Sequence, residues 1–269
     1  MLEANFYQHL AAQLKALLPR CWYASAEPER GQGIVILDNL ETLGASFPDP
    51  LQSWHPDRVA RALESLASIH GQTWNAAPAT YPWLRVGTWI REVATTLLSE
   101  EHWDKIFSSA VAPVLPSALQ DRERARKALF EMWRLDDLSP QRCVCHSDAH
   151  MGNTYLAANG DVGFLDWQGV ALAPHMDDVS NIIGGSMSIA DRRGNERDLL
   201  RHYLDVLAGK GGPRLGFDEA WLDYRRYHMH GILWAVTPAS MQSGDKVLAM
   251  AERHIVAIVD HEVVKLLRS

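Results

Sequence analysis

The sequence predicts an α+β protein in which a small α/β portion precedes a larger, mainly helical portion. Extended segments separated by turn residues gather near the N-terminus, whereas apolar residues recur at helical spacing over most of the chain after residue 55. The composition, 47% hydrophobic and 22% charged residues over 269 positions, is that of an ordinary globular protein with ample material for a core.

The first forty residues predict a helix followed by a β-hairpin. In MLEANFYQHLAAQLKALLP, leucines and a phenylalanine recur at helical spacing, and the helix is expected to end at Pro19. Two extended segments follow at residues 20–27 and 33–40. The residues between them include Pro28 and Gly31, which favour a turn.

The rest of the chain reads as helices around a short β-containing segment. From His55 onward, Val59, Leu63, Leu66 and Ile69 fall on one helical face. The further elements predicted in chain order are an interruption at 76–83, helices to about residue 112 and over 121–135, β-like runs at 142–145 and 162–165, and helices over 177–269 with a glycine-rich break at 209–216.

Charge and composition narrow the class of partners. A formal charge of −7 gives no overall attraction to nucleic acid or to an anionic membrane. No apolar run reaches the roughly 18 residues that span a bilayer, and the N-terminus lacks the pattern of a signal peptide. The three cysteines do not form a disulfide framework, and Cys143 and Cys145 are expected to be buried thiols on one face of a strand. We therefore expect a cytoplasmic protein without nucleic-acid or membrane partners.

Chemistry-bearing residues gather between Val144 and Gly169. His146, Asp148 and Asn153 stand in the order H-x-D-x-x-x-x-N, the spacing of a kinase catalytic loop, and Asp166 follows in GFLDW. The intervening Asn-Gly pair favours a hairpin that returns the chain to its start. This pattern predicts phosphoryl transfer, in which a carboxylate accepts the proton of an alcohol and oxygen ligands hold Mg²⁺ on the phosphates.

A second interpretation uses the same residues differently. His146, Asp148 and His150 could be ligands of Zn²⁺ or of a metal pair in a hydrolase. That interpretation would leave Asn153 and Asp166 without a defined task, so we favour phosphoryl transfer.

The segments CHSDAHMGN and GFLDWQG resemble the catalytic and metal-binding segments of the aminoglycoside phosphotransferase and choline kinase superfamily. The whole chain is most similar to its ecdysteroid kinase-like branch. The resemblance implies a protein-kinase-like two-lobe fold, with a truncated N-lobe over residues 1–41 and a helical C-lobe over residues 42–269. It also implies transfer of phosphate from ATP or GTP, with Mg²⁺, to a hydroxyl of a small molecule.

The resemblance assigns roles residue by residue. Asp148 resembles the catalytic base, and His146 resembles the residue that braces the catalytic loop. Asn153 and Asp166 match the magnesium ligands. Asp178 resembles a structural aspartate that bonds the loop backbone, and the family usually has glycine where this chain has Ser147.

Other implied contacts concern the nucleotide. The backbone near Asn39 and Leu40 would meet the base, and His150 either positions phosphate or packs. Glu3 resembles the helix glutamate that pairs with a phosphate-binding lysine, but it could equally be a helix acid favoured by the dipole. That lysine and a glycine-rich loop belong to strands before this helix, and the only lysine before residue 100 is Lys15.

Three expectations follow from the missing match to this lysine and glycine-rich loop and from the composition of the late helices. The chain could be a catalytically impaired kinase-fold binder instead of an active enzyme. An unpaired edge of the small sheet could lead to self-association through the small lobe. Because the late helices carry no dense acidic run, the acceptor is expected to be a relatively apolar alcohol, with Tyr227, His230 and Trp234 either lining its site or packing in the core.

Overall fold

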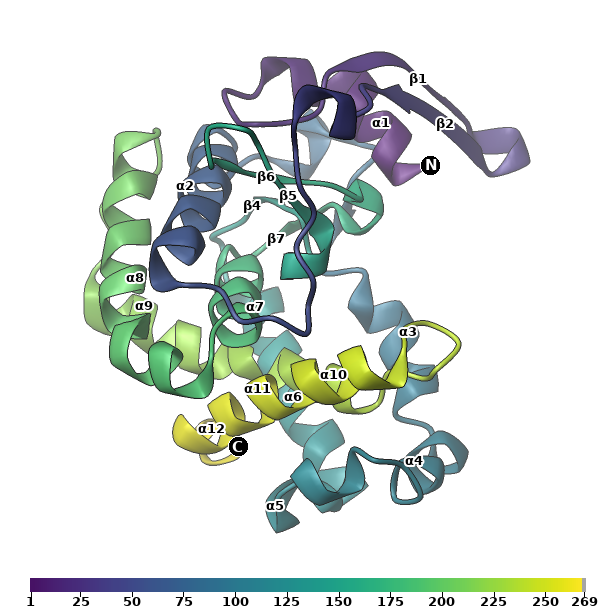
Figure 1. The fold of residues 1–269 in the computed structure, drawn as a ribbon, viewed down its shortest axis with the longest axis vertical. Helices are drawn as coiled ribbons and strands as arrows, with labels where there is room; N and C mark the ends of the chain where they lie inside the picture. The colour runs from purple at the N-terminus through teal and green to yellow at the C-terminus, as the bar shows by residue number, and fades with distance from the viewer. Residues whose placement is uncertain (268–269) are drawn as a thin grey trace.

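The computed structural model describes residues 1–267 and has the predicted α+β architecture (Figure 1). The strands are β1 (Cys21–Glu27), β2 (Gln32–Leu37), β3 (Arg85–Val86), β4 (Cys143–Cys145), β5 (Thr154–Leu156), β6 (Val162–Phe164) and β7 (Ala171–Ala173). The helices are α1 (Leu2–His9), α2 (Pro56–Gln72), α3 (Ile90–Leu97), α4 (Glu100–Ile106), α5 (Ser117–Gln120), α6 (Arg122–Leu138), α7 (Met176–Ser186), α8 (Ile189–Gly209), α9 (Phe217–Tyr227), α10 (Ile232–Ala235), α11 (Gly244–Asp260) and α12 (Val263–Leu266). Within the described residues, no helix combines the length and the apolar character needed to cross a membrane.

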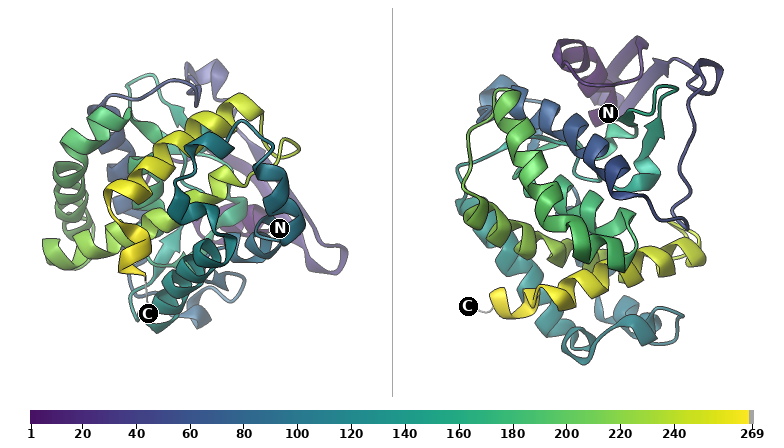
Figure 2. Two further views of the ribbon diagram at one scale, coloured as in Figure 1. Left: turned by 90° about the horizontal axis from the view of Figure 1, so that it is seen from below. Right: turned by 60° about the vertical axis from the view of Figure 1, so that its left-hand side comes forward.

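The N-terminal hairpin forms a small layer at one end of the molecule, opposite the C-terminal helices (Figures 1 and 2). β1 and β2 pair antiparallel, and α1 packs against both. Tyr23 lies opposite Ile36, and both are exposed together with Ile34, whereas Val35 and Leu37 face the core. No other strand of residues 1–267 pairs with this hairpin. Self-association through it stays a prediction.

The first helix is shorter than its apolar pattern predicts. It ends at His9, and after a 3₁₀ turn the chain is already extended at Leu14, so the expected end at Pro19 is wrong. The reason is tertiary: Gln72 accepts the backbone N–H of Lys15 at 2.9 Å, and the hydroxyl of Ser68 donates to the Lys15 carbonyl at 2.7 Å. Side chains of α2 thus replace the hydrogen bonds that a longer helix would have made.

Helices surround the central strands. α2 packs along α8, and both contribute apolar side chains to one continuous core (Figure 2). The central sheet has the order β3-β7-β4, with β3 parallel and β4 antiparallel to β7. The β-like runs predicted at 142–145 and 162–165 are confirmed as β4 and β6, while β3 and β7, of two and three residues, are too short for sequence periodicity to reveal.

The hairpin of β5 and β6 carries the motif residues toward one another. Its turn contains Asn159 and Gly160, and Gly160 has φ +85°, a conformation that glycine adopts without strain. At the open end, the N–H of Leu165 donates to the carbonyl of Asn153 at 2.8 Å. The residue before Asp166 is therefore fixed beside Asn153.

Helix α1 is joined to this hairpin by an aromatic stack. The rings of Phe6 and Trp167 lie parallel with centroids 4.0 Å apart, and both side chains are fully buried. Since Trp167 directly follows Asp166, the stack connects the N-terminal layer to the expected metal-binding segment.

We expect Phe6→Ala to lower the free energy of unfolding by about 3–5 kcal/mol, because it removes a buried aromatic ring and leaves a cavity against Trp167. Chemical denaturation followed by circular dichroism measures this change. Gln8→Ala, at an exposed position of the same helix, is the matched control and should change stability little. Equal effects of the two substitutions would contradict the proposed role of the stack.

Candidate functional site

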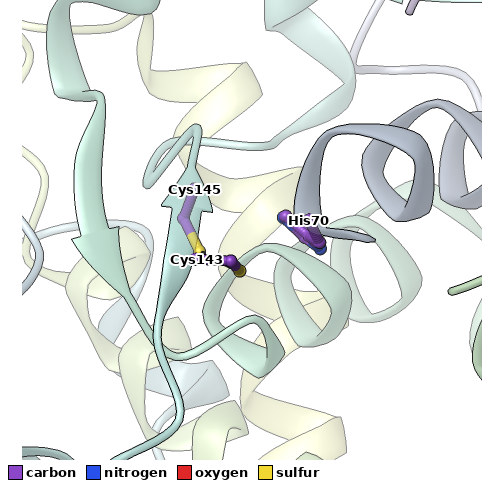
Figure 3. Close-up of side chains that lie close together, drawn as sticks. All are labelled: His70, Cys143 and Cys145. Carbon is purple, nitrogen blue, oxygen red and sulfur yellow. Dashed lines mark hydrogen bonds between the residues drawn. The ribbon is translucent and has the colours of Figure 1, made fainter. Parts of the chain in front are cut away.

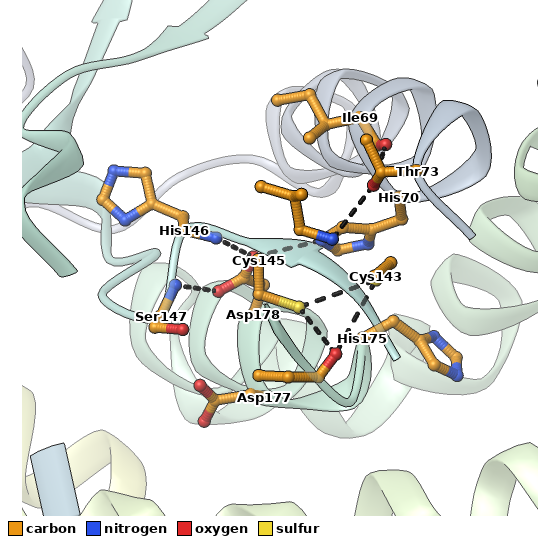
Figure 4. A network of polar contacts seen from close by, with 12 residues as sticks. Ile69, His70, Thr73, Cys143, Cys145, His146, Ser147, His175, Asp177 and Asp178 are labelled. Carbon is orange, nitrogen blue, oxygen red and sulfur yellow. Dashed lines mark hydrogen bonds and ion pairs between the residues drawn. The ribbon is translucent and has the colours of Figure 1, made fainter. Parts of the chain in front are cut away.

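The loop after β4 is held by one buried carboxylate. Asp178, on α7, accepts the backbone N–H of His146 at 2.7 Å and that of Ser147 at 2.8 Å (Figure 4). Ser147 has φ +63°, a left-handed conformation that is strained for a residue with a side chain. This conformation explains why glycine suits the position in the resembled family.

Behind Asp178 lies a buried chain of hydrogen bonds. His70 contacts Asp178 through Nε2 at 3.1 Å and the Tyr203 hydroxyl through Nδ1 at 2.8 Å, and Tyr203 contacts Nδ1 of His175 at 3.0 Å. Burial disfavours the charged form of His70, but the hydrogen-bonded carboxylate of Asp178 opposes this effect, and the pKa of His70 is raised to about 9. Burial lowers the pKa of His175 to about 3, so the ring that contacts the Tyr203 hydroxyl is neutral. His70 is thus a core histidine with both ring nitrogens engaged.

Asp148 and Asn153 form the centre of the loop. The side-chain amide of Asn153 donates to the carbonyl of Asp148 at 3.0 Å and to its carboxylate at 3.2 Å. This orientation commits the amide nitrogen to Asp148 and leaves the amide oxygen of Asn153 as the atom available to a metal ion. The Asp148 side chain is about a quarter exposed, at 25%.

His146 connects the loop to the segment of Asp166. Its Nε2 lies 2.7 Å from the carbonyl of Leu165, and its Nδ1 accepts the backbone N–H of Asp148 at 3.3 Å. The ring also packs against Trp167. Because both ring nitrogens are engaged, His146 braces the backbone on either side of the site, as the resemblance implies.

Asp166 lies two residues after the end of β6 in a left-handed conformation, with φ +59°. Glu3 lies nearby: its carboxylate accepts the backbone N–H of Trp167 at 3.3 Å. Burial raises the pKa of Glu3, and the charge of Asp166 adds to that effect. The structure therefore brings Glu3 to the expected metal-binding segment.

His150 faces Asp148 across the loop. Its Nδ1 accepts the N–H of Gly152 at 3.0 Å, so the proton of the neutral ring is on Nε2, 3.8 Å from the Asp148 carboxylate. Burial lowers the pKa of His150, whereas the charge of Asp148 acts in the opposite direction. A Trp234 ring packs edge-on against it at 5.1 Å.

Several of these side chains line one cavity of about 370 Å³. The motif residues Asp148, His150, Asn153 and Asp166 all line it. Its further walls come from the linker before α2, from α3, α7 and α11, and from the region around α10; they are Pro48, Pro50, Trp89, Ile90, Leu97, Ser147, Gly152, Gln168, Asp177, Ser180, Asn181, Tyr227, His228, His230, Gly231, Leu233, Trp234, Thr237, Met241, Gln242, Lys246 and His254.

Not every predicted residue reaches this cavity. Glu3, Asn39, Leu40 and His146 are not among the lining residues in the described part of the chain. Asn39 lies just after β2, where its side chain accepts the N–H of Glu41 at 3.0 Å. Tyr227, His230 and Trp234, which the sequence left between packing and substrate contact, all line the cavity.

The hydrolase interpretation of the same motif is not supported. A metal site made of His146, Asp148 and His150 needs a free nitrogen on each histidine, but His146 has none. Within residues 1–267, the groups whose ligand atoms converge are His70 with Cys143 and Cys145, and Glu196 with His228 and His261.

The cysteine group lies outside the cavity and is fully buried (Figure 3). The sulfurs of Cys143 and Cys145 are 3.6 Å apart, and that of Cys145 donates to the carbonyl of Ala173 at 3.3 Å. Burial raises the pKa of Cys145 well above the ordinary value. These are buried thiols, as the sequence predicts.

Sequence reasoning missed Asp177 as a site residue. The sequence feature that could have revealed Asp177 is the pair of adjacent aspartates in HMDDVS. Only Asp178 of this pair matched the family pattern. The two adjacent carboxylates point in different directions, Asp178 toward the loop backbone and Asp177 away from it (Figure 4). Asp177 instead lines the cavity and pairs with His230.

Comparisons with known proteins agree with this geometry. The model of the ecdysteroid kinase-like family matches residues 2–210. Comparison with curated proteins gives no match.

Three solved structures illustrate the shared fold. A choline kinase from Streptococcus pneumoniae has a TM-score of 0.53 at 17% identity, over 96% of this chain and 79% of that chain. The AMP-bound complex of a spectinomycin phosphotransferase has a TM-score of 0.53 at 15% identity, over 99% and 84%. An ethanolamine kinase from Plasmodium vivax has a TM-score of 0.52 at 13% identity, over 95% and 71%. The predicted protein-kinase-like fold is confirmed.

The charge on His70 predicts a pH dependence of stability. Because its pKa is raised from 6.5 to about 9 on folding, its contribution is fully present below pH 6.5 and is lost as the pH rises through about 9. We expect the free energy of unfolding to fall over this window by up to about 3 kcal/mol. Urea denaturation at several pH values measures the slope, and His70→Gln should lack this part of it. An unchanged slope in the variant would contradict a charged His70.

Proposed function

Since the chain belongs to the ecdysteroid kinase-like family, we propose that it transfers a phosphoryl group from a magnesium-bound nucleoside triphosphate to a hydroxyl of a small molecule. One observation carries the proposal: Asp148, Asn153 and Asp166 line a single cavity, although 18 positions separate the first from the last. Had they lined separate cavities, no shared site for a metal ion and an alcohol would exist.

The donor set suits magnesium. Asn153 offers an amide oxygen and Asp166 a carboxylate, and hard oxygen ligands of this kind are those that Mg²⁺ prefers. These two residues would hold the ion. When bound, Mg²⁺ neutralises charge on the phosphate oxygens.

Asp148 acts on the acceptor. Its carboxylate orients the hydroxyl and takes its proton as the hydroxyl oxygen bonds to the γ-phosphorus and the bond to the bridging oxygen of the leaving nucleoside diphosphate breaks. The Asn153 amide fixes the rotamer of Asp148 through its 3.2 Å hydrogen bond. His150 directs its Nε2 proton toward the same region and can donate to a transferring phosphate oxygen.

The nucleotide base would meet the linker after β2. The backbone N–H groups of Asn39 and Leu40 donate to no acceptor within residues 1–267, so both can bond a purine. An AMP complex of the similar spectinomycin phosphotransferase supports an adenine nucleotide, and GTP is the alternative. Glu3 would lie near the phosphates. Its carboxylate accepts the backbone N–H of Trp167, the residue that follows Asp166.

The acceptor would have a substantial apolar body. Trp89, Ile90, Leu97, Leu233 and Trp234 line the cavity beyond the catalytic loop. Apolar walls with a few convergent polar groups are typical of small-molecule sites.

A kinase-fold binder without turnover is the alternative. It is motivated by Glu3, which has no lysine partner within residues 1–267. Calorimetric titration of the protein with Mg·ATP separates the two: micromolar, metal-dependent binding favours the enzyme, and its absence favours the binder.

We expect Asp148→Asn to lower kcat for phosphorylation of an alcohol panel by about 10²–10⁴-fold, because the amide cannot accept the hydroxyl proton. Transfer of ³²P from labelled ATP measures the rate, and calorimetry checks that Mg·ATP still binds. Full turnover in the variant would show that Asp148 is not the base.

We expect Asp166→Asn to weaken Mg²⁺-dependent nucleotide binding by roughly tenfold or more, since it replaces a charged metal ligand. Calorimetry with and without Mg²⁺ measures the effect. Asp161→Asn, at an exposed position of the same hairpin, should bind like the wild type. Similar losses in both variants would argue against a metal ligand at Asp166.

A further inference from the structure

One side chain in the wall of the cavity is bonded to the backbone of the catalytic loop. Trp89 lies directly before α3 and lines the same cavity as Asp148. Its indole N–H donates to the carbonyl of Ser147 at 3.1 Å, across 58 positions of the sequence. This bond joins a surface that an acceptor can touch to the loop that carries the proposed base.

The backbone of Ser147 is held on both sides. Asp178 accepts its N–H at 2.8 Å (Figure 4), and Trp89 donates to its carbonyl. That carbonyl belongs to the peptide bond between Ser147 and Asp148. Because a peptide bond is planar, the direction of the carbonyl also fixes the direction of the Asp148 N–H, which Nδ1 of His146 accepts at 3.3 Å. The bond from Trp89 therefore helps to orient the backbone from which the Asp148 carboxylate extends.

The same indole ring lies against the metal-binding segment. Gly169 follows Asp166 by three positions, and a Cβ atom at Gly169 would lie only 2.6 Å from Cδ1 and 2.7 Å from Nε1 of Trp89. A side chain at this position would push the ring away from the Ser147 carbonyl. The close approach of the ring thus depends on glycine, and it places Trp89 against both segments of the motif.

The start of α3 is fixed in place by Arg91. Its guanidinium donates to Asp137 at 2.7 Å and to Asp136 at 3.1 Å, both on α6. Asp136 is buried, so this charge-assisted bond is shielded from water. Ile90 and Leu97 of α3 line the cavity together with Trp89. The apolar wall formed by these three residues is therefore held firmly relative to the loop.

Building on the proposed phosphotransferase function, we propose that Trp89 is a positioning residue that joins the acceptor wall to the catalytic loop. The apolar body of the alcohol packs on the wall at the start of α3, and the indole N–H holds the Ser147 carbonyl so that Asp148 meets the hydroxyl at a fixed distance from that wall. Trp89 acts through the loop and takes no proton itself.

The substitution Trp89→Phe removes the donor and keeps an aromatic wall. We expect it to lower kcat roughly tenfold for the alcohol of the panel that the wild-type protein phosphorylates fastest, because one hydrogen bond to the loop is lost. The KM for that alcohol should change by less than about twofold, since the apolar contact remains. Trp83→Phe is the matched control: Trp83 is half-buried and is not among the cavity-lining residues of the described chain, so kcat should stay unchanged.

Hydrogen exchange followed by mass spectrometry tests the same bond without nucleotide or alcohol. We expect the peptide that contains residues 146–150 to exchange roughly tenfold faster in Trp89→Phe than in the wild-type protein, because the loop opens more easily. Peptides from α8 should exchange at the wild-type rate, and Trp83→Phe should leave both regions unchanged. A general loss of stability would instead accelerate exchange in α8 as well.

The two measurements separate this assignment from the proposed function. Faster exchange confined to the loop supports the role of Trp89. Unchanged exchange of the loop in Trp89→Phe, or equal acceleration in α8, overturns it, and so does an unchanged kcat in a protein that transfers phosphate. Absence of transfer by the wild-type protein would instead remove the proposed function, and the exchange result would still decide whether Trp89 holds the loop.

Discussion

The site depends on one buried carboxylate and the two backbone N–H groups that it accepts. Asp178 is fully buried, and such a charge is tolerated in a protein interior only when donors surround it. The amides of His146 and Ser147 and the ring of His70 provide them. Since two of these donors are backbone, the same interaction that stabilises Asp178 fixes the course of the loop. The left-handed turn at Ser147 persists because this carboxylate holds it there.

From this anchor, short hydrogen bonds extend to every proposed catalytic group. His146 reaches the carbonyl of Leu165 and so ties the loop to the strand before Asp166. Asn153 reaches back to Asp148 with its side chain and to Leu165 with its backbone carbonyl. The proposed base and metal ligands therefore form one rigid unit built from adjacent segments, which is the preorganisation that phosphoryl transfer requires.

That these residues lie close together could be predicted from the sequence, because their geometry is local. The spacing of His146, Asp148 and Asn153 fits a single turn of loop, and the Asn-Gly pair returns the chain to Asp166. The features that were not predicted from the sequence depend on contacts between distant segments. The first helix ends at His9 because α2 captures Lys15, and the paired strands β3 and β7 are too short to show a period. Neither feature can be recognised from one continuous stretch of the sequence.

The adjacent aspartates at the start of α7 show why Asp177 was also not predicted. Both residues read as helix acids, since carboxylates near a helix N-terminus are common for electrostatic reasons alone. Their difference arises only from what packs around them: Asp178 meets backbone donors and a charged histidine, whereas Asp177 meets one neutral imidazole. A buried carboxylate with one satisfied and one free oxygen adds little to folding.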